Sequence, residues 1–186
     1  MMKYDIPWIQ AQRQLGPVQY LFFWGHRPES NGSIGKGCLS QWWESPFAHD
    51  GLAYASAEHW MMACKARLFG DEGMLKQILH AKTPADAKKL GRKVHNFDSR
   101  KWDSEKYGFV LQGNLLKFGQ HANLRAFLLG TGEKILVEAS PYDNVWGIGL
   151  SAEAPGIQDP ANWQGENLLG FALMETRDLL RNEIVS

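Results

Sequence analysis

The stretch Ser56–Ala66 constrains the fold of this chain most, because it combines the start of a helix with a carboxylic acid, Glu58, and an amine, Lys65. Ser56 is a good N-cap, and the residues that follow it (Ala-Glu-His-Trp-Met-Met-Ala-Cys-Lys-Ala) are typical of a helix. Residues three, four and seven apart share one helix face, so Glu58, Met62 and Lys65 should point the same way. Such a face indicates either a catalytic pocket or a solvated helix edge, and the solvated edge is the more common arrangement.

The chemistry of the acid and the amine depends on what surrounds them. Apolar neighbours make an ammonium costly, so in a pocket the pKa of Lys65 would fall. A lysine of that kind is a nucleophile near neutral pH. Glu58, in the first turn of the predicted helix, would then be available for proton transfer.

Composition bounds the class of protein. The chain has 186 residues, 44% hydrophobic and 22% charged, which suits an ordinary globular protein with a full core. We predict one domain over residues 18–186, after a polar lead-in of residues 1–17. Lys+Arg and Asp+Glu both total 20, so we expect no general nucleic-acid coat, which needs excess positive charge. The eight tryptophans indicate either a pocket with stacking walls or a Trp-rich core.

Cysteine usage and hydropathy indicate the compartment. Cys38 and Cys64 make no framework of spaced pairs, so we expect free thiols in a reducing compartment. The N-terminus carries no apolar run of the signal-peptide type, and no stretch approaches the ~20 apolar residues that span a bilayer. We therefore expect a cytoplasmic protein. The sequence contains no zinc-type Cys/His spacing, no P-loop and no GxGxxG motif.

Periodicity and turn signals place the remaining elements. Helices are predicted over residues 56–69, 72–81, 84–94, 104–118, 121–129 and 168–182, and strands or extended segments over residues 18–24, 38–47, 52–54 and 135–137. A hairpin around His49–Gly51 should deliver the chain to the helix after Ser56. The loop Gly25–Gly37 holds glycines and a lysine that could cradle a phosphate, but its spacing favours a plain mobile loop.

A second candidate segment, residues 138–149, follows the strand predicted at residues 135–137. It places Asp143, Asn144 and Trp146 in a loop hinged by Gly147 and Gly149. Loops at strand ends are common places for ligand chemistry. An aspartate in such a loop can equally be a turn former, so both interpretations stay open.

Several stretches together resemble one family, the NADAR domain (YbiA-like) proteins. The resemblance rests on segments in family order over about residues 19–180, namely Leu39-Ser40-Gln41-Trp42 before Pro46, Ala57-Glu58-His59-Trp60 through Lys65-Ala66, Leu90-Gly91-Arg92, Trp102, Lys117-Phe118, Leu136-Val137-Glu138, Asp143 with Trp146-Gly147, and Asn167 through Leu169-Gly170 to Leu173-Met174. The departures from the family are Leu39-Ser40-Gln41-Trp42 for the frequent Phe-Ser-Asn-Phe, Ala55-Ser56 for Thr or Pro-Thr, and Ile148 where some members carry an acid. The resemblance implies an α+β fold, a predominantly helical single domain with a small β-sheet.

The same resemblance implies an N-glycosidase that cleaves the bond between ribose and an exocyclic amine of a base. One branch of the family releases an aminopyrimidine from ribose 5-phosphate in early riboflavin-pathway intermediates, and another removes ADP-ribose from guanine in nucleic acid. For this chain we expect a small phosphorylated ribosyl-base substrate, and nucleic acid only as an ADP-ribosylated substrate. We expect no metal or other cofactor and no membrane partner.

Particular residues receive roles from the resemblance. The expected catalytic residues are Glu58, Lys65 and Asp143, and the expected substrate-binding residues are Ser40, Gln41, Arg92, Trp102, Trp146, Gly147 and Asn167. The rings of Trp102 and Trp146 would face the base. Arg92 would either hold the phosphate through its planar guanidinium or lie on a helix surface. Asn167 would either bind the ligand or cap backbone groups.

Two mechanisms fit the expected catalytic residues. Neutral Lys65 can form a Schiff base with the anomeric carbon of the ring-opened sugar while Glu58 moves protons. Alternatively, Glu58 or Asp143 activates water and stabilises an oxocarbenium-like cation, and Lys65 only orients Glu58 through an ion pair. Outside catalysis, the chain could be a module that binds ADP-ribose or a related nucleotide without hydrolysing it, or a protein whose Trp-rich surface binds other proteins.

Overall fold

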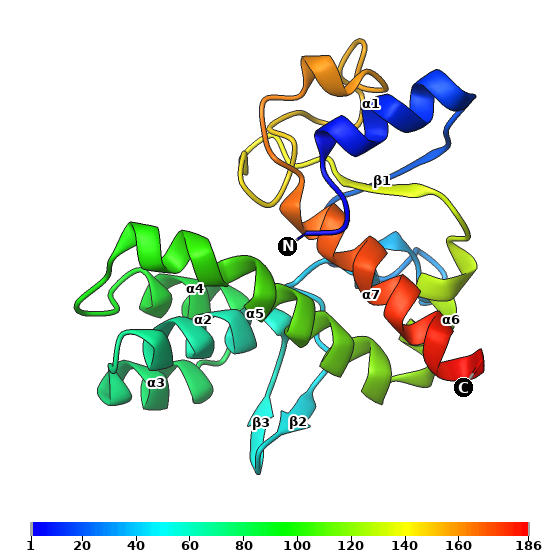
Figure 1. The fold of residues 1–186 in the computed structure, drawn as a ribbon. Coiled ribbons are helices and arrows are strands. Elements are labelled where there is room, and N and C mark those ends of the chain that lie inside the picture. The colour runs from blue at the N-terminus through cyan, green and yellow to red at the C-terminus, as the bar shows by residue number, and fades with distance from the viewer. Residues whose placement is uncertain (1, 186) are drawn as a thin grey trace. The chain divides into compact units, whose positions relative to one another are not determined.

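The structure, a computed structural model, describes residues 2–185 and divides into two compact units (Figure 1). The central unit is Gln41–Ala122, and the flanking unit joins Met1–Ser40 to Asn123–Ser186. Residues 1 and 186, the outer ends of the two segments that we predicted as lead-in and domain, lie outside the described residues.

The central unit is a group of helices with a hairpin. Its elements are β2 (Phe47–His49), β3 (Leu52–Tyr54), α2 (Ala57–Leu68), α3 (Glu72–Leu79), α4 (Pro84–Gly91) and α5 (Ser99–Gln120). Strands β2 and β3 pair antiparallel, with Phe47 opposite Tyr54. Helix α2 contacts α3, α4 and α5, so it is the centre of the unit, as Figure 1 shows.

Close packing around α2 explains why it is buried on nearly every side. A Cβ atom added at Gly113 of α5 would lie 2.5 Å from Cδ1 of Trp60, and one added at Gly91 of α4 would collide with the side chain of Met62. The two glycines therefore let α4 and α5 approach α2 closely. Trp60 also contacts the hairpin, with its ring centroid 4.9 Å from that of Tyr54.

The flanking unit combines a parallel strand pair with helices. Its elements are α1 (Ile6–Leu15), β1 (Tyr20–Phe23), a 3-10 helix (Lys36–Leu39), α6 (Ala122–Gly130, whose first residue belongs to the central unit), β4 (Ile135–Glu138), a 3-10 helix (Pro160–Asn162) and α7 (Leu168–Val185). Strand β1 pairs with β4 in parallel, with Tyr20 opposite Ile135, and α7 packs against β4. Arg177 of α7 is 2% exposed, and its Nη1 donates to the Thr131 hydroxyl and the Lys134 carbonyl, each at 2.8 Å, so oxygen atoms inside this unit hold one end of the guanidinium.

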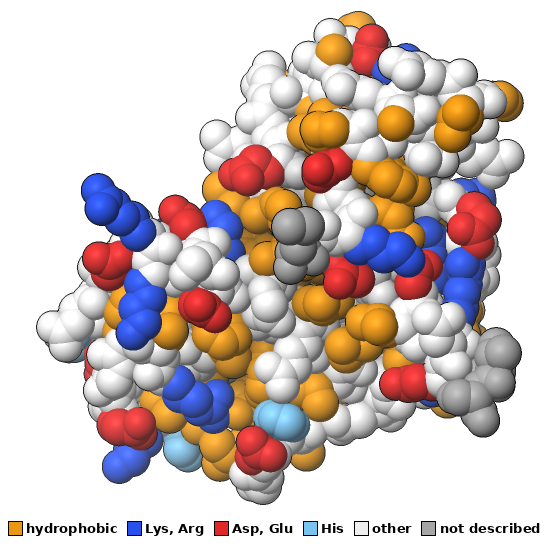
Figure 2. All heavy atoms as spheres, in the orientation of Figure 1, with side chains coloured by type: hydrophobic (Ala, Val, Ile, Leu, Met, Phe, Trp, Pro, Cys, Tyr) orange, Lys and Arg blue, Asp and Glu red, His pale blue; other side chains and the backbone are white. Residues whose placement is uncertain are grey.

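The predicted fold class, mainly helical with a small amount of sheet, is confirmed in the described residues. The hairpin before α2 and the parallel strand β4 lie where the sequence predicts them. Among the described residues, no helix is both long and apolar enough to cross a membrane. On the face in Figure 2, acidic and basic side chains are interspersed instead of gathering into one basic patch.

Three local predictions differ from the structure. The polar lead-in contains α1, whose start is capped by Asp5 accepting from the Trp8 N–H at 2.7 Å. The extended segment predicted at residues 38–47 is wrong, because a 3-10 helix ends at Leu39, turns follow, and the strand begins only at Phe47. The polar connection predicted around Trp102 is also wrong. Asp98 caps α5 by accepting from the Lys101 N–H at 2.8 Å, so the helix begins at Ser99.

Candidate active site

Glu58 is a buried acid at the start of α2. It is 2% exposed, and the indole N–H of Trp42 donates to its Oε2 at 3.3 Å. Its backbone N–H donates to the carbonyl of Gln41 at 3.0 Å, which ties the segment before the hairpin to the first turn of the helix. A donor on one carboxylate oxygen fixes the orientation of the acid, so Trp42 is a site residue that our sequence-based list did not include.

The side chain of Gln41, the residue whose carbonyl accepts from the Glu58 N–H, is also buried. It is 6% exposed, and neither its amide nitrogen nor its amide oxygen has a hydrogen-bond partner among the described residues. An unsatisfied buried polar group costs about 1–3 kcal/mol. An amide retained at such a position is well suited to pair with a bound ligand.

Lys65 lies two turns after Glu58, roughly 10 Å further along the axis of α2. Its Nζ is 4.2 Å from the ring centroid of Phe97 and 5.5 Å from that of Trp102. Burial lowers the pKa of the amine, because the charged form is separated from water. The ion pairs of the described residues do not include Lys65, so the orienting ion pair with Glu58 is not formed in this structure.

The solvated-edge interpretation of this helix face is wrong. Glu58 is buried, Met62 is 7% exposed and Lys65 is half-buried. The seven-residue spacing of Glu58 and Lys65 predicts that they share a helix face. That face is buried because α4 and α5 pack against α2. An acid and an amine on a buried face favour a pocket over a salt-bridge edge.

His59 anchors the start of α2 next to the acid. It is 1% exposed, its Nδ1 lies 2.8 Å from the hydroxyl of Ser56, and its Nε2 lies 3.1 Å from the carbonyl of Ala81. Because a carbonyl only accepts, Nε2 carries the proton and Nδ1 accepts from the serine hydroxyl. Burial lowers the pKa of this imidazole, so the neutral ring is the form that the fold stabilises.

The two other predicted residues of the central unit lie on different helices. Trp102 is in the first turn of α5, partly buried, and its ring stacks on that of Phe109 with centroids 6.1 Å apart. The same ring lies 5.5 Å from Nζ of Lys65, so Trp102 belongs with Lys65 in the candidate site. Arg92 caps the C-terminal end of α4 and is exposed, which leaves its guanidinium open to solvent and to an anion.

In the flanking unit, Asp143 organises the loop after β4. Its Oδ1 accepts from the backbone N–H groups of Val145 at 3.0 Å and Trp146 at 2.9 Å, so the acid closes a turn around its own loop. A Cβ atom at Gly147 would lie 2.8 Å from the carbonyl oxygen of Glu138 and 2.9 Å from that of Asp143. Asp143 and Trp146 are thus held together on a tightly packed turn that only glycine permits.

Asn167 takes the backbone-capping role of the two that we considered. It is 0% exposed, its amide nitrogen donates to the Leu136 carbonyl, and its amide oxygen accepts from the Glu138 N–H, both at 3.0 Å. Its φ of 57° lies in the left-handed region that asparagine tolerates. The side chain joins β4 to the start of α7 and exposes no atom to a ligand.

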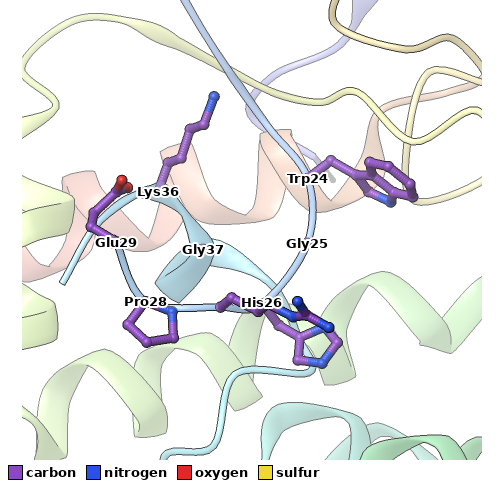
Figure 3. Close-up of a pocket in the computed structure, with 8 residues that line it drawn as sticks. Trp24, Gly25, His26, Pro28, Glu29, Lys36 and Gly37 are labelled. Carbon is purple, nitrogen blue, oxygen red and sulfur yellow. The ribbon is translucent and has the colours of Figure 1, made fainter. Parts of the chain in front are cut away.

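The loop that could cradle a phosphate is folded in the flanking unit and lines a pocket of about 290 Å³. The N–H of Glu29 donates to the Ser33 carbonyl at 3.0 Å, which gives the loop an internal turn. The residues that line the pocket are Trp24, Gly25, His26, Arg27, Pro28, Glu29, Lys36 and Gly37. Figure 3 shows the side chains of Lys36 and Glu29 pointing to one side of the loop and that of His26 to the other. Ser40 follows at the end of the 3-10 helix.

The candidate site residues, Trp42 included, therefore form two sets, one in each unit. The central set contains Glu58 and Lys65 with Gln41, Trp42 and Trp102, and the flanking set contains Asp143, Trp146 and Gly147. Within the described residues, no three histidine, cysteine, aspartate or glutamate side chains gather to hold a metal ion. Cys38 and Cys64 are both buried and form no disulfide.

The sequence and the fold of this chain are similar to those of known proteins. A family model described as NADAR domain matches residues 22–181. N-glycosidase R617 of Acanthamoeba polyphaga mimivirus is 42% identical over 166 residues, which cover 86% of this chain and 95% of that protein. N-glycosidase YbiA of Escherichia coli (strain K12) is 33% identical over 138 residues, 74% of this chain and 78% of that protein. The NMR structure of the E. coli protein YbiA matches with a TM-score of 0.73 at 28% identity, covering 90% of this chain and 88% of that one.

Proposed function

The chain belongs to the NADAR family and is an N-glycosidase, a hydrolase of N-glycosyl bonds, and we propose that its substrate is a phosphoribosylamino-pyrimidine. In this proposal the enzyme hydrolyses the bond between ribose and the exocyclic amine of the base. The observation that carries it is the half-buried amine of Lys65, which shares a face of α2 with the buried acid Glu58. A pure binding module has no need for a reactive amine of this kind.

Lys65 is the proposed nucleophile. A ribosylamine opens to an imine between C1 of the sugar and the nitrogen of the base. Neutral Lys65 adds to C1, a proton moves to the base nitrogen, and the C1–base bond breaks, which leaves C1 joined to Nζ as an imine. Water then adds to C1, the C1–Nζ bond breaks, and the products are the free base amine, the sugar phosphate and unmodified Lys65. The burial that lowers the pKa of Lys65 supports this role, because it increases the fraction of the amine that is neutral and able to attack.

Glu58 is the proposed carrier of those protons. It lies on the same helix face as the amine, and the Trp42 indole holds one of its oxygen atoms. The competing mechanism, water attack assisted by Glu58 or Asp143, uses the same acids without a covalent intermediate. Asp143 is proposed to assist proton transfer or to hold ribose hydroxyls, since the hydrogen bonds that close its loop turn both use Oδ1.

Recognition of the base and phosphate is proposed to involve four side chains. The buried amide of Gln41 offers one donor and one acceptor group, which match the amide edge of a pyrimidine. Trp102 and Trp146 supply ring faces for stacking. The exposed guanidinium of Arg92 can hold a phosphate bidentately.

A second candidate function, removal of ADP-ribose from guanine, is favoured by an observation in the flanking unit. Trp24 is 54% exposed and Tyr142, directly before Asp143, is 86% exposed, and their ring centroids are 5.9 Å apart. Arg27 and Lys36 line the pocket next to Trp24. Exposed rings beside cations are suited to a second base and its phosphates.

One assay separates the candidates. The protein is incubated with a panel of ribosylamino-pyrimidine phosphates and ADP-ribosylated guanine nucleotides, and released base is measured by chromatography. Turnover of the pyrimidine compounds supports the first proposal. Turnover of ADP-ribosylated guanine alone selects the second, and tight binding without release of any base would leave the chain a nucleotide-binding module.

A further inference from the structure

Two aromatic rings enclose the amine of Lys65, and we refer to Phe97 and Trp102 as the aromatic cage. Nζ lies 4.2 Å from the centroid of Phe97, closer than the 5.5 Å to Trp102. Neither the sequence pattern nor the family resemblance drew attention to Phe97. Of the two rings, Phe97 therefore presents the nearer aromatic face to the proposed nucleophile and acts more strongly on a positive charge at Nζ.

The position of Phe97 is set by its neighbours. It follows Asn96, whose φ of 54° makes a left-handed turn, and it directly precedes Asp98, the N-cap of α5. Its ring meets that of Phe69 edge to face, with centroids 5.3 Å apart. At 47% exposed, Phe97 contributes little to the core, yet it is held over the amine.

The face of an aromatic ring attracts positive charge, and more strongly where water is displaced. Before the reaction this attraction favours the ammonium form of Lys65, which cannot attack, so the cage gives no help at that stage. Once the base amine has left, the imine nitrogen at Nζ is protonated and carries a positive charge. The cage then faces the charge that the reaction creates, at the atom where it forms.

We propose that Phe97 is a catalytic residue, which with Trp102 stabilises the positive charge of the protonated imine between Lys65 and the sugar. This role rests on the proposed function, because it requires the Schiff-base route. It assigns to a half-exposed phenylalanine the electrostatic task that carboxylates perform in other glycosidases. The apolar ring does so without forming an ion pair that would keep Lys65 protonated.

The first test varies the charge on the ring face and leaves its size almost unchanged. Phe97 is replaced by phenylalanines with one, two or three ring fluorines, which weaken the negative face in steps. We expect kcat to fall at each step, by about 10-fold for the trifluoro ring, with KM changed less than twofold. Values of kcat that do not depend on fluorination would overturn the proposal.

Matched variants separate charge from packing. Phe97→Leu should lower kcat about 10-fold, and Phe97→Tyr, which restores a ring face, should keep kcat near that of the unsubstituted protein. Phe69→Leu removes only the edge contact to Phe97 and should lower kcat less than Phe97→Leu does, because the ring face toward Nζ is still present. Equal losses in the leucine and tyrosine variants of Phe97 would show that shape and not the ring face matters.

A readout without substrate distinguishes failure of this inference from failure of the proposed function. In the substrate-free protein, acetic anhydride modifies Lys65 at a rate set by the fraction of neutral amine, and peptide mass spectrometry measures that rate. Weakening the ring face destabilises the ammonium, so the trifluoro ring should speed the modification about 2- to 3-fold at constant pH. If no riboside is hydrolysed but this rate rises, the cage acts on charge at Nζ and only the substrate assignment fails. An unchanged rate contradicts the cage itself.

Discussion

Gln41 buries an amide that has no hydrogen-bond partner among the described residues, so its substitution should separate stability from binding. Methionine has a similar length and no polar atoms to satisfy. We therefore expect Gln41→Met to raise the free energy of unfolding by about 1 kcal/mol, measured by urea denaturation. KM for the riboside should rise at the same time, because the base loses its partner. A less stable variant with unchanged KM would show that the amide serves the fold.

Glu58 is the residue whose loss should affect the rate more than the binding. Glu58→Gln keeps the shape and the contact to Trp42 while removing proton transfer, so kcat should fall by about 10²–10⁴. Ligand affinity, measured by calorimetry, should stay within a few-fold. Near-normal turnover would reduce Glu58 to a helix-start residue held by Trp42.

Trp146 tests the flanking set of site residues. Trp146 comes three residues after Asp143, and its backbone N–H donates to the carboxylate of that residue. One hydrogen-bonded turn therefore holds both residues. If the ring stacks on the base, Trp146→Ala should weaken ligand binding by about 1–3 kcal/mol. Thermal unfolding of the same variant measures whether the ring also stabilises the fold. A large fall in Tm with unchanged affinity would make Trp146 a packing residue.

At the scale of the element, the start of α2 should make stability depend on pH through His59. Burial depresses the pKa of this imidazole in the folded state, while an unfolded histidine titrates near about 6.5. Below that pH the unfolded chain binds a proton that the folded chain does not, so stability is present above it and lost as pH falls. Urea denaturation at pH 7.5 and pH 5 should show this loss, and His59→Gln should reduce the difference. An identical pH dependence in both proteins would contradict the role of the neutral ring.

The helix starts show what sequence alone can predict about these elements. Ser56 and the pair Thr83-Pro84 signal α2 and α4 because capping is a local interaction, readable within four residues. Asp98 gives the same signal for α5, but the polar residues after it are typical of a connection and hide the helix start. Helix α1 has one buried residue, Ile9, so the apolar pattern that would have indicated it is weak.

At the scale of the whole molecule, the candidate site was predictable where it depends on helical spacing and not where it depends on distant contacts. The common face of Glu58 and Lys65 follows from their separation of seven residues. The aromatic cage joins Lys65 to Phe97, which is 32 positions later, and no local pattern links the two residues. Asn167 illustrates the same limit, because its exchange of hydrogen bonds with β4 crosses about 30 residues.

The proposed hydrolysis depends on covalent chemistry at Lys65. Borohydride added during turnover reduces an imine to a stable amine, so it should leave the sugar phosphate attached to Lys65, detectable by peptide mass mapping. Lys65→Ala should abolish both the adduct and hydrolysis. Lys65→Arg should fail as well, because a guanidinium stays protonated.

The decisive measurement is this trapping experiment on protein that is shown, in the same sample, to be releasing base. The Schiff-base mechanism predicts a peptide containing Lys65 with the mass of one reduced sugar phosphate and no such adduct on Lys88 or Lys101, two other lysines of the central unit. An unmodified Lys65 peptide from an actively hydrolysing sample would contradict it and assign the reaction to water attack by the carboxylates.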